Sequence, residues 1–271
     1  LIAPQVWAWR EGRVKRMRRD LQRVLCIFPF EEEYFARRGV QATYIGHPLT
    51  WSLKPTLSRA EFFRKHNLHS EAPLVTLLPG SRVGEVSRHL PAVVAAAKVI
   101  QREMQTNLVL ATPVQFAERA GPSFFQERIG RSSIQILEGE TSDALAHADV
   151  AIAASGTVTI EAAILGTPMV TFYKVTALSW ALGRYLVRVP YYSMVNLVAG
   201  RRVVPELMQD EATGERLAAE TLQLLKNPAS RAEMKRSLAD VASKLRAPAH
   251  PMERAASIVD EYLKRPVIEK I

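Results

Sequence analysis

The stretch Leu-Val-Thr-Leu-Leu-Pro-Gly-Ser-Arg-Val-Gly-Glu-Val, residues 74–86, decides the fold. Its first five residues are apolar or β-branched and predict a strand buried on both faces. Pro79 and Gly80 then break the strand, and a helical pattern runs from Glu85 towards Gln101. A strand, a turn and a helix in this order indicate one unit of a parallel α/β sheet.

The turn after this strand is a candidate anion site. The first N–H groups of a helix lack partners, and the helix dipole favours negative charge there. The guanidinium of Arg82 adds two parallel donors that suit phosphate oxygens. A capped turn with a surface arginine explains the same pattern, and this stretch alone does not choose between the two.

A second turn of this kind lies at Ser155-Gly156-Thr157, where another predicted strand meets another predicted helix. Bare N–H groups at that helix start can accept a diphosphate, and glycine allows close approach to the backbone. Glu161 lies four residues beyond Thr157, on the same helix face, where its carboxylate can accept from both hydroxyls of a ribose. The alternative is an ordinary favourable charge near a helix start. We favour the ribose contact because the residues around Glu161 are apolar, and a carboxylate among them needs a partner.

The alternation of strands and helices predicts a parallel sheet covered on both faces. Ligands on such sheets bind beyond the carboxyl ends of the strands, so Gly80–Arg82 and Ser155–Thr157 should share one rim. We expect strands at 74–78, 107–111, 134–137, 150–153 and 169–173, and helices at 85–101, 114–119, 142–147 and 157–165.

The flanking segments suggest a second domain. Residues 10–23 form a basic amphipathic helix whose cationic face is either solvated or in contact with phosphate or a membrane. Residues 49–58 lose periodicity and carry Pro55, so we predict a linker there. An apolar helix is expected at 175–189. The predicted domains are 1–49, 50–247 and a C-terminal helix within 248–271 that packs on the first domain or on a partner subunit.

Composition narrows the class of protein. The 271 residues carry a net charge of +9, which favours anionic partners such as phosphate, acidic lipid or nucleic acid. Cys26 is the only cysteine, so disulfides are excluded. The histidines show no metal-ligand spacing, and we expect most of them at the surface. The chain opens with Leu1 and reads as the latter part of a longer protein.

Several nucleotide-binding motifs are absent. The sequence contains neither a P-loop nor a Gly-x-Gly-x-x-Gly fingerprint, and it has no Asp-x-Asp pair. A diphosphate would therefore be neutralised by Arg82 and helix termini, and we expect neither a metal nor a cofactor.

Five motifs together resemble the lipid-A-disaccharide synthase family. Each is weak alone, but their order and spacing match from Pro4 to the last helix. They are Trp7-Ala-Trp-Arg10, Gly46-His47-Pro48, Leu77–Arg82 with Glu85, Ala154–Thr157 with Glu161, and Asn196–Arg201 with Glu206.

The resemblance implies a GT-B glycosyltransferase with two Rossmann-like domains. The family transfers 2,3-diacylglucosamine from UDP to the 6-hydroxyl of lipid X, with inversion at the anomeric carbon. Its members need no metal, associate peripherally with the cytoplasmic face of the inner membrane, and in some cases form swapped dimers through the C-terminal segment.

The resemblance also assigns residues. Arg82 and Asn196 are the candidate catalytic groups, and the apolar, basic segment 178–192 suits acyl chains unless it is a buried core helix. The expected UDP-sugar contacts are Gly80, Ser81, Arg82, Glu85, Ser155, Gly156, Thr157, Glu161, Asn196 and Arg201. The expected acceptor or cleft residues are Trp7, Trp9, Arg10 and His47, although from its place on the hinge alone we favour a structural role for His47.

One departure concerns the N-terminal domain. The family begins with Gly-rich strand–loop–helix units and an aspartate thought to be the general base, and residues 1–49 match only the end of that domain. We therefore predict UDP binding with little or no turnover. Two alternatives remain: a UDP-sugar epimerase of the same fold, and a basic nucleic-acid-binding module built on residues 10–23.

Overall fold

The computed structural model describes residues 6–9, 12–121, 123–130, 132–186 and 189–264. The chain forms two compact units, which are described separately. The first contains Leu1–Ser52, Leu186–Val189 and Ala242–Ile271, and the second contains Leu53–Tyr185 and Pro190–Val241.

The second unit is built on a parallel sheet. Within the described residues the sheet has six strands in the order β5-β4-β3-β6-β7-β8. Every residue of β3, β4 and β6 is buried, because helices cover both faces of a parallel sheet. The strands are β3 (Leu74–Leu78), β4 (Asn107–Thr112), β5 (Gln135–Glu138), β6 (Val150–Ala154), β7 (Met169–Tyr173) and β8 (Glu206–Met208).

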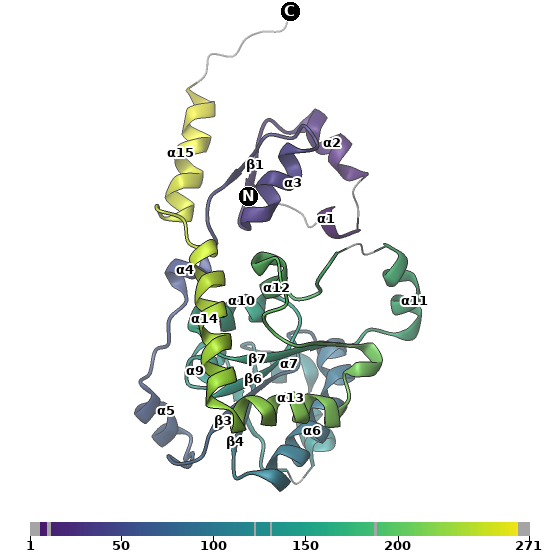
Figure 1. Cartoon of the computed structure of the whole chain (residues 1–271), viewed down its shortest axis with the longest axis vertical. Helices are drawn as coiled ribbons and strands as arrows, with labels where there is room; N and C mark the ends of the chain where they lie inside the picture. Colours follow the sequence, from purple (N-terminus) through teal and green to yellow (C-terminus); the bar gives the residue numbers. More distant parts are fainter. Residues whose placement is uncertain (1–5, 10–11, 122, 131, 187–188, 265–271) are drawn as a thin grey trace, which may run out of the picture. The chain divides into compact units, whose positions relative to one another are not determined.

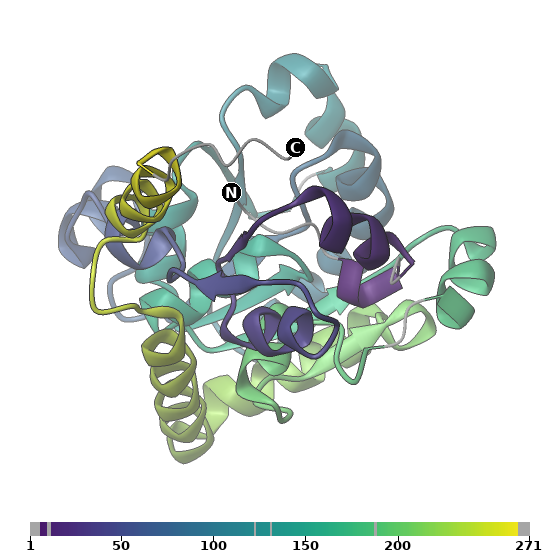
Figure 2. The ribbon, with the colours of Figure 1, turned by 90° about the horizontal axis from the view of Figure 1, so that it is seen from above.

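Helices form a layer on each face of this sheet (Figure 1). One layer contains α6 (Val83–Glu103), α7 (Phe116–Ala120), α8 (Phe124–Ile129) and α13 (Gly214–Lys226). The other contains α9 (Thr141–Ala146), α10 (Thr157–Leu165) and α12 (Met194–Ala199). The apolar α11 (Ala177–Leu186) stands at one edge of the unit, away from both layers (Figures 1 and 2). These elements confirm the predicted α/β class.

The α6 and α13 helices approach each other closely at Gly214. A Cβ on Gly214 would lie 3.0 Å from the backbone carbonyl carbon of Ala95 in α6. Because glycine has no side chain, the first turn of α13 packs directly on the α6 backbone.

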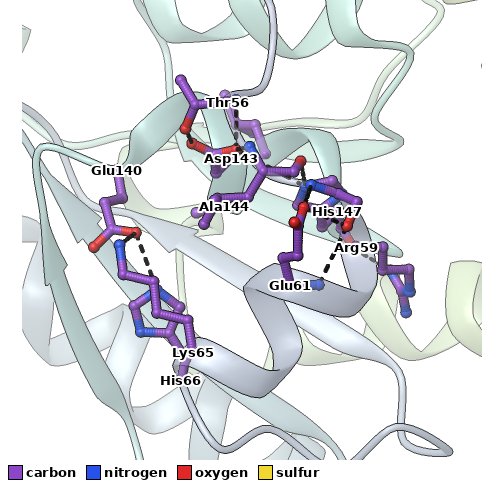
Figure 3. Close-up of polar contacts among 12 residues, drawn as sticks. Thr56, Arg59, Glu61, Lys65, His66, Glu140, Asp143, Ala144 and His147 are labelled. Carbon is purple, nitrogen blue, oxygen red and sulfur yellow. Dashed lines mark hydrogen bonds and ion pairs between the residues drawn. The ribbon is translucent and has the colours of Figure 1, made fainter.

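The chain enters the second unit through a segment fixed by α9 (Figure 3). The buried carboxylate of Asp143 accepts from the N–H groups of Thr56 and Leu57 at 2.8 Å and from the Thr56 hydroxyl at 2.7 Å. Burial opposes ionisation, but these hydrogen bonds hold the pKa of Asp143 below its usual value. The Nε2 atom of His147 lies 2.8 Å from the carbonyl of Leu57. The same segment continues into α5 (Arg59–Lys65), where Lys65 pairs with Glu140 at 2.8 Å.

The first unit contains a two-stranded parallel sheet, β1 (Val24–Cys26) and β2 (Ala42–Tyr44), beside α3 (Pro29–Ala36). The basic helix α2 (Arg13–Asp20) buries Val14 and Met17 and exposes its cations, as its amphipathic pattern predicts. Other helices of this unit are α1 (Val6–Trp9), α4 (Leu49–Ser52) and α15 (Pro251–Leu263), while α14 (Pro228–Leu245) begins in the second unit. No helix among the described residues has the length and apolar character needed to cross a membrane.

Three expectations about the elements need correction. The predicted linker at 49–58 begins with the helix α4. The short elements α8 and β8 were not predicted. Most histidines are predicted to lie at the surface, but His47, His66, His89 and His147 are buried.

Candidate functional site

The two predicted loops follow neighbouring strands. Strand β3 pairs with β6, and Leu78 is in register with Ala153, so Gly80 and Gly156 lie beyond the same edge of the sheet. From this pair the chain proceeds in opposite directions, through β4 and β5 on one side and through β7 and β8 on the other. A crevice opens where the strand order reverses in this way, and it is the usual ligand site of such sheets.

The first loop is ordered by Glu85. The Oε2 atom of Glu85 accepts from the N–H of Ser81 at 3.0 Å, across a turn in which Gly80 has φ of +128°. The same carboxylate also acts electrostatically on Tyr173, at the end of β7. Burial and the Glu85 charge both raise the pKa of Tyr173. Glu85 was expected to contact UDP-sugar, but in this arrangement it fixes the loop.

Two guanidinium groups stand beside this loop. Arg82 caps the start of α6 and is exposed, and Arg88 is exposed about two turns further along the helix. Both positive charges act on Tyr173 and offset part of the rise in its pKa. Neither guanidinium has a hydrogen bond or ion pair within the described part of the chain. They are therefore available to an anion at this edge.

The second loop presents an open helix N-terminus. The Ser155 hydroxyl donates to the carbonyl of Tyr192 at 2.8 Å, and Gly156 precedes α10 with extended backbone. In the described structure the N–H groups of Thr157 and Val158 have no hydrogen-bond acceptor. A Cβ on Gly156 would meet nothing within 4 Å, so the space before these donors is open. These are the features of an anion site at a helix start.

Glu161 lies one turn along α10 from Thr157. Its side chain is half-buried, and burial raises the pKa of its carboxyl group. Among the described residues it has no hydrogen-bond partner. A partly desolvated carboxylate with unused acceptor capacity beside an anion site suits a ligand hydroxyl.

Asn196 is fully buried and belongs to α12, not to an exposed loop. Its Nδ2 group donates to Glu206 at 2.8 Å and to the carbonyl of Val204 at 3.0 Å. Its Oδ1 atom accepts from the N–H groups of Val203 and Val204 at 2.7 and 3.0 Å. All of its hydrogen-bonding capacity is used within the chain. The assignment of Asn196 as a group that contacts substrate is therefore replaced by a positioning role.

Arg201 points away from the predicted site. It precedes β8, towards the amino ends of the strands, and donates to the hydroxyl of Ser237 in α14 at 3.0 Å. The two candidate loops lie beyond the carboxyl ends. We therefore remove Arg201 from the proposed nucleotide contacts.

Comparison with known proteins identifies the family. A family model described as lipid-A-disaccharide synthetase matches residues 1–259. A lipid-A-disaccharide synthase from Solibacter usitatus is 58% identical over 264 residues, covering 97% of this chain and 68% of that protein. Another from Syntrophus aciditrophicus is 39% identical over 271 residues, covering 97% and 69%. The chain belongs to the lipid-A-disaccharide synthase family.

Solved structures show the fold that this chain shares with other proteins. A putative UDP-N-acetylglucosamine 2-epimerase from Listeria monocytogenes has a TM-score of 0.57 at 15% identity, covering 89% of this chain and 60% of that one. WaaG, a glycosyltransferase involved in lipopolysaccharide biosynthesis, has a TM-score of 0.54 at 18% identity, covering 88% and 62%. The fold is that of GT-B glycosyltransferases and UDP-N-acetylglucosamine epimerases, and at these identities the likeness shows the fold alone.

His89 was not predicted from the sequence. It is fully buried in α6, and its Nδ1–H donates to the carbonyl of Pro79 at 2.7 Å. Its Nε2 accepts from the N–H of Lys174 at 3.0 Å. His89 therefore joins the first loop to the end of β7. Its position four residues after Glu85, on the same face of the helix, was the available signal.

The predicted acceptor or cleft residues Trp7 and His47 lie in the first unit. The indole N–H of Trp7 donates to the buried Glu31 at 3.0 Å, so it contributes to internal structure. His47 is buried, its Nδ1 accepts from the N–H of Leu49 at 3.3 Å, and burial lowers its pKa to about 4. Arg10 lies outside the described residues, as does the side chain of Trp9.

Proposed function

We propose that the edge beyond β3 and β6 binds the UDP group of UDP-2,3-diacylglucosamine for transfer of the sugar to lipid X. The observation that carries this proposal is the pairing of two anion-binding loops at the point where the strand order reverses. Family membership supplies the substrates and the reaction. The products are the lipid A disaccharide 1-phosphate and UDP.

The diphosphate is held by Arg82 together with the Thr157 and Val158 N–H groups. In the transfer, the bond between the anomeric carbon and the phosphate oxygen breaks, and a bond to the acceptor 6-oxygen forms on the opposite face. Negative charge grows on the departing UDP, where the guanidinium and the positive end of α10 stabilise it. The 6-hydroxyl proton passes to a general base.

Glu161 completes the nucleotide site in this proposal. Its half-buried carboxylate accepts hydrogen bonds from the ribose hydroxyls. Glu85 and His89 do not contact the nucleotide. They hold the first loop in the shape that presents Arg82.

A UDP titration tests the site. We expect Arg82→Ala to weaken UDP binding by about 2 kcal/mol, a factor of about 30 in Kd. Arg102→Ala is the matched control, because Arg102 is exposed in the last turn of the same helix. Equal UDP affinity in the Arg82 variant and the wild type would remove Arg82 from the site.

Turnover by the 271 residues alone is a separate question. The family resemblance places the general base in a part of the N-terminal domain that residues 1–49 do not match, so we propose UDP binding with little or no disaccharide synthesis. Measurable synthesis by the isolated chain from UDP-2,3-diacylglucosamine and lipid X would contradict this.

Membrane association and assembly are part of the proposal. The diacylated substrates favour peripheral binding at the cytoplasmic face of the inner membrane, which vesicle co-sedimentation would measure. A homodimer through the C-terminal segment stays a prediction. It is favoured by Met252, Val259 and Leu263, which are exposed on one side of α15.

A further inference from the structure

A cavity of about 510 Å³ lies beside the second loop and is not used by the diphosphate site. One wall is aromatic, with Trp180 from α11 and Tyr192 from the loop before α12. The lining also includes two acidic residues of the short 3-10 helix that follows β8, Asp210 and Glu211, and the polar residues Arg202, Glu206 and Gln209. We call this cavity the sugar pocket.

A hydrogen bond of Tyr192 connects the lining of the sugar pocket to the anion site. The carbonyl of Tyr192 accepts from the Ser155 hydroxyl at 2.8 Å, directly before the start of α10. Its N–H donates to Glu206 at 3.1 Å, and the N–H of Ser193 donates to the same carboxylate at 2.9 Å. The buried amide of Asn196 in turn holds Glu206. The backbone of Tyr192 is therefore fixed relative to the diphosphate loop.

The pocket combines two kinds of surface. The rings of Trp180 and Tyr192 lie 6.2 Å apart at an angle of 45°, and Tyr192 is 38% exposed. The carboxylates of Asp210 and Glu211 are exposed and have no hydrogen bond or ion pair within the described chain. Aromatic faces beside free carboxylates suit a ligand with one apolar C–H face and several hydroxyl groups.

A pyranose ring has this chemistry. Its axial C–H groups pack on an aromatic face, and its hydroxyls donate strong hydrogen bonds to carboxylates. A glucosamine ring acylated at positions 2 and 3 keeps free hydroxyls at positions 4 and 6. Two neighbouring carboxylates can accept from these two groups.

We propose that the sugar pocket holds the pyranose ring of the nucleotide-sugar donor, an inference that rests on the proposed function. Trp180 and Tyr192 pack against the ring, and Asp210 and Glu211 accept from its hydroxyls. The bond from Ser155 to Tyr192 sets the spacing between the sugar and the diphosphate. Asn196 acts on the sugar through Glu206 as a positioning residue.

The test compares a ligand with the sugar and a ligand without it. Calorimetric titrations use UDP and UDP-2,3-diacetylglucosamine, whose short acyl groups keep it monomeric in water. The variants are Trp180→Ala and the double variant Asp210→Asn/Glu211→Gln. The control is Glu215→Gln, an exposed carboxylate of α13 that does not line the pocket.

We expect both pocket variants to raise the Kd of UDP-2,3-diacetylglucosamine about tenfold and to change the Kd of UDP less than twofold. The double variant alters only exposed side chains, so it tests whether the pocket binds the sugar even if Trp180→Ala folds poorly. Unchanged donor affinity in the double variant, with UDP binding intact, would overturn the sugar pocket. Failure of the wild type to bind UDP would instead overturn the proposed function.

Discussion

A Cβ on Gly80 would lie 2.6 Å from the carboxyl carbon of Glu85. This contact and the φ of +128° at Gly80 both require glycine. We expect Gly80→Ala to displace Glu85, free the Ser81 N–H and disorder the loop that presents Arg82. Strain of about 1–3 kcal/mol predicts a loss of UDP affinity of about fivefold to a hundredfold, measured by titration, together with a lower Tm.

Gly84→Ala is the matched control for Gly80→Ala. Gly84 lies inside α6, and a Cβ there would meet nothing within 4 Å. Because alanine favours helix over glycine, this variant should gain about 0.5–1 kcal/mol of stability with unchanged UDP affinity. Wild-type UDP binding by Gly80→Ala would show that Glu85 does not shape the site.

Variants of Asn196 can distinguish a positioning role of this residue from direct contact with the substrate. Asn196→Ala leaves the Val203 and Val204 N–H groups buried without acceptors, and we expect a loss of about 3 kcal/mol in unfolding free energy. Asn196→Asp keeps these two bonds but sets a second carboxylate oxygen against Glu206. For Asn196→Asp we expect a lower free energy of unfolding in denaturant and a weaker affinity for the donor in titration. A variant as stable as the wild type that binds the donor more weakly would instead indicate direct contact with the substrate.

The central strands could be predicted because they are buried on both faces and read as uninterrupted apolar runs. Strand β7 was predicted with its observed bounds, Met169–Tyr173. Strand β8 was missed because it has three residues and follows Pro205, so its place in the sheet depends on pairing with β7. The helix α4 was missed because its four residues are too few to show a period.

The positions of the two loops could be predicted, but the interactions that hold the first loop in place could not. Parallel strands end at one edge, so the sequence places Gly80 and Gly156 together. Tyr173 and Lys174, at the end of β7, lie about 85 residues beyond Glu85 and His89 in the chain, and only the fold brings them near these side chains. His89 can be buried because backbone groups form hydrogen bonds with both of its ring nitrogens. The number of polar residues in the sequence does not reveal such partners.

At pH 7 the carboxylate of Glu161 should lower the stability of the folded chain and strengthen its binding of the nucleotide. Burial raises its pKa in the folded state, so its contribution to stability is largest below the ordinary value of 4.5 and is lost as pH rises through the folded pKa. At pH 7 we expect Glu161→Gln to have a higher Tm than the wild type, by ~2–4 °C for each 1 kcal/mol recovered. The same variant should bind UDP more weakly, since a carboxylate accepts more strongly from ribose hydroxyls than an amide does. Equal Tm values at pH 4 and a difference at pH 7 identify the effect, whereas stronger UDP binding by Glu161→Gln would contradict the ribose contact.

His47 should make the first unit sensitive to mild acid. Its pKa falls from 6.5 to about 4 because the folded chain buries the ring, so the unfolded chain takes up the proton first. The corresponding stability is present above pH 6.5 and is lost as pH falls towards 4, by about 3 kcal/mol in total. Denaturant unfolding followed by tryptophan fluorescence should show this loss in the wild type. His47→Gln should give a flatter profile between pH 6.5 and 4, while the exposed His69→Gln should retain the wild-type slope. Identical slopes for His47→Gln and the wild type would mean that the imidazole of His47 accepts a proton in the folded state as readily as in water.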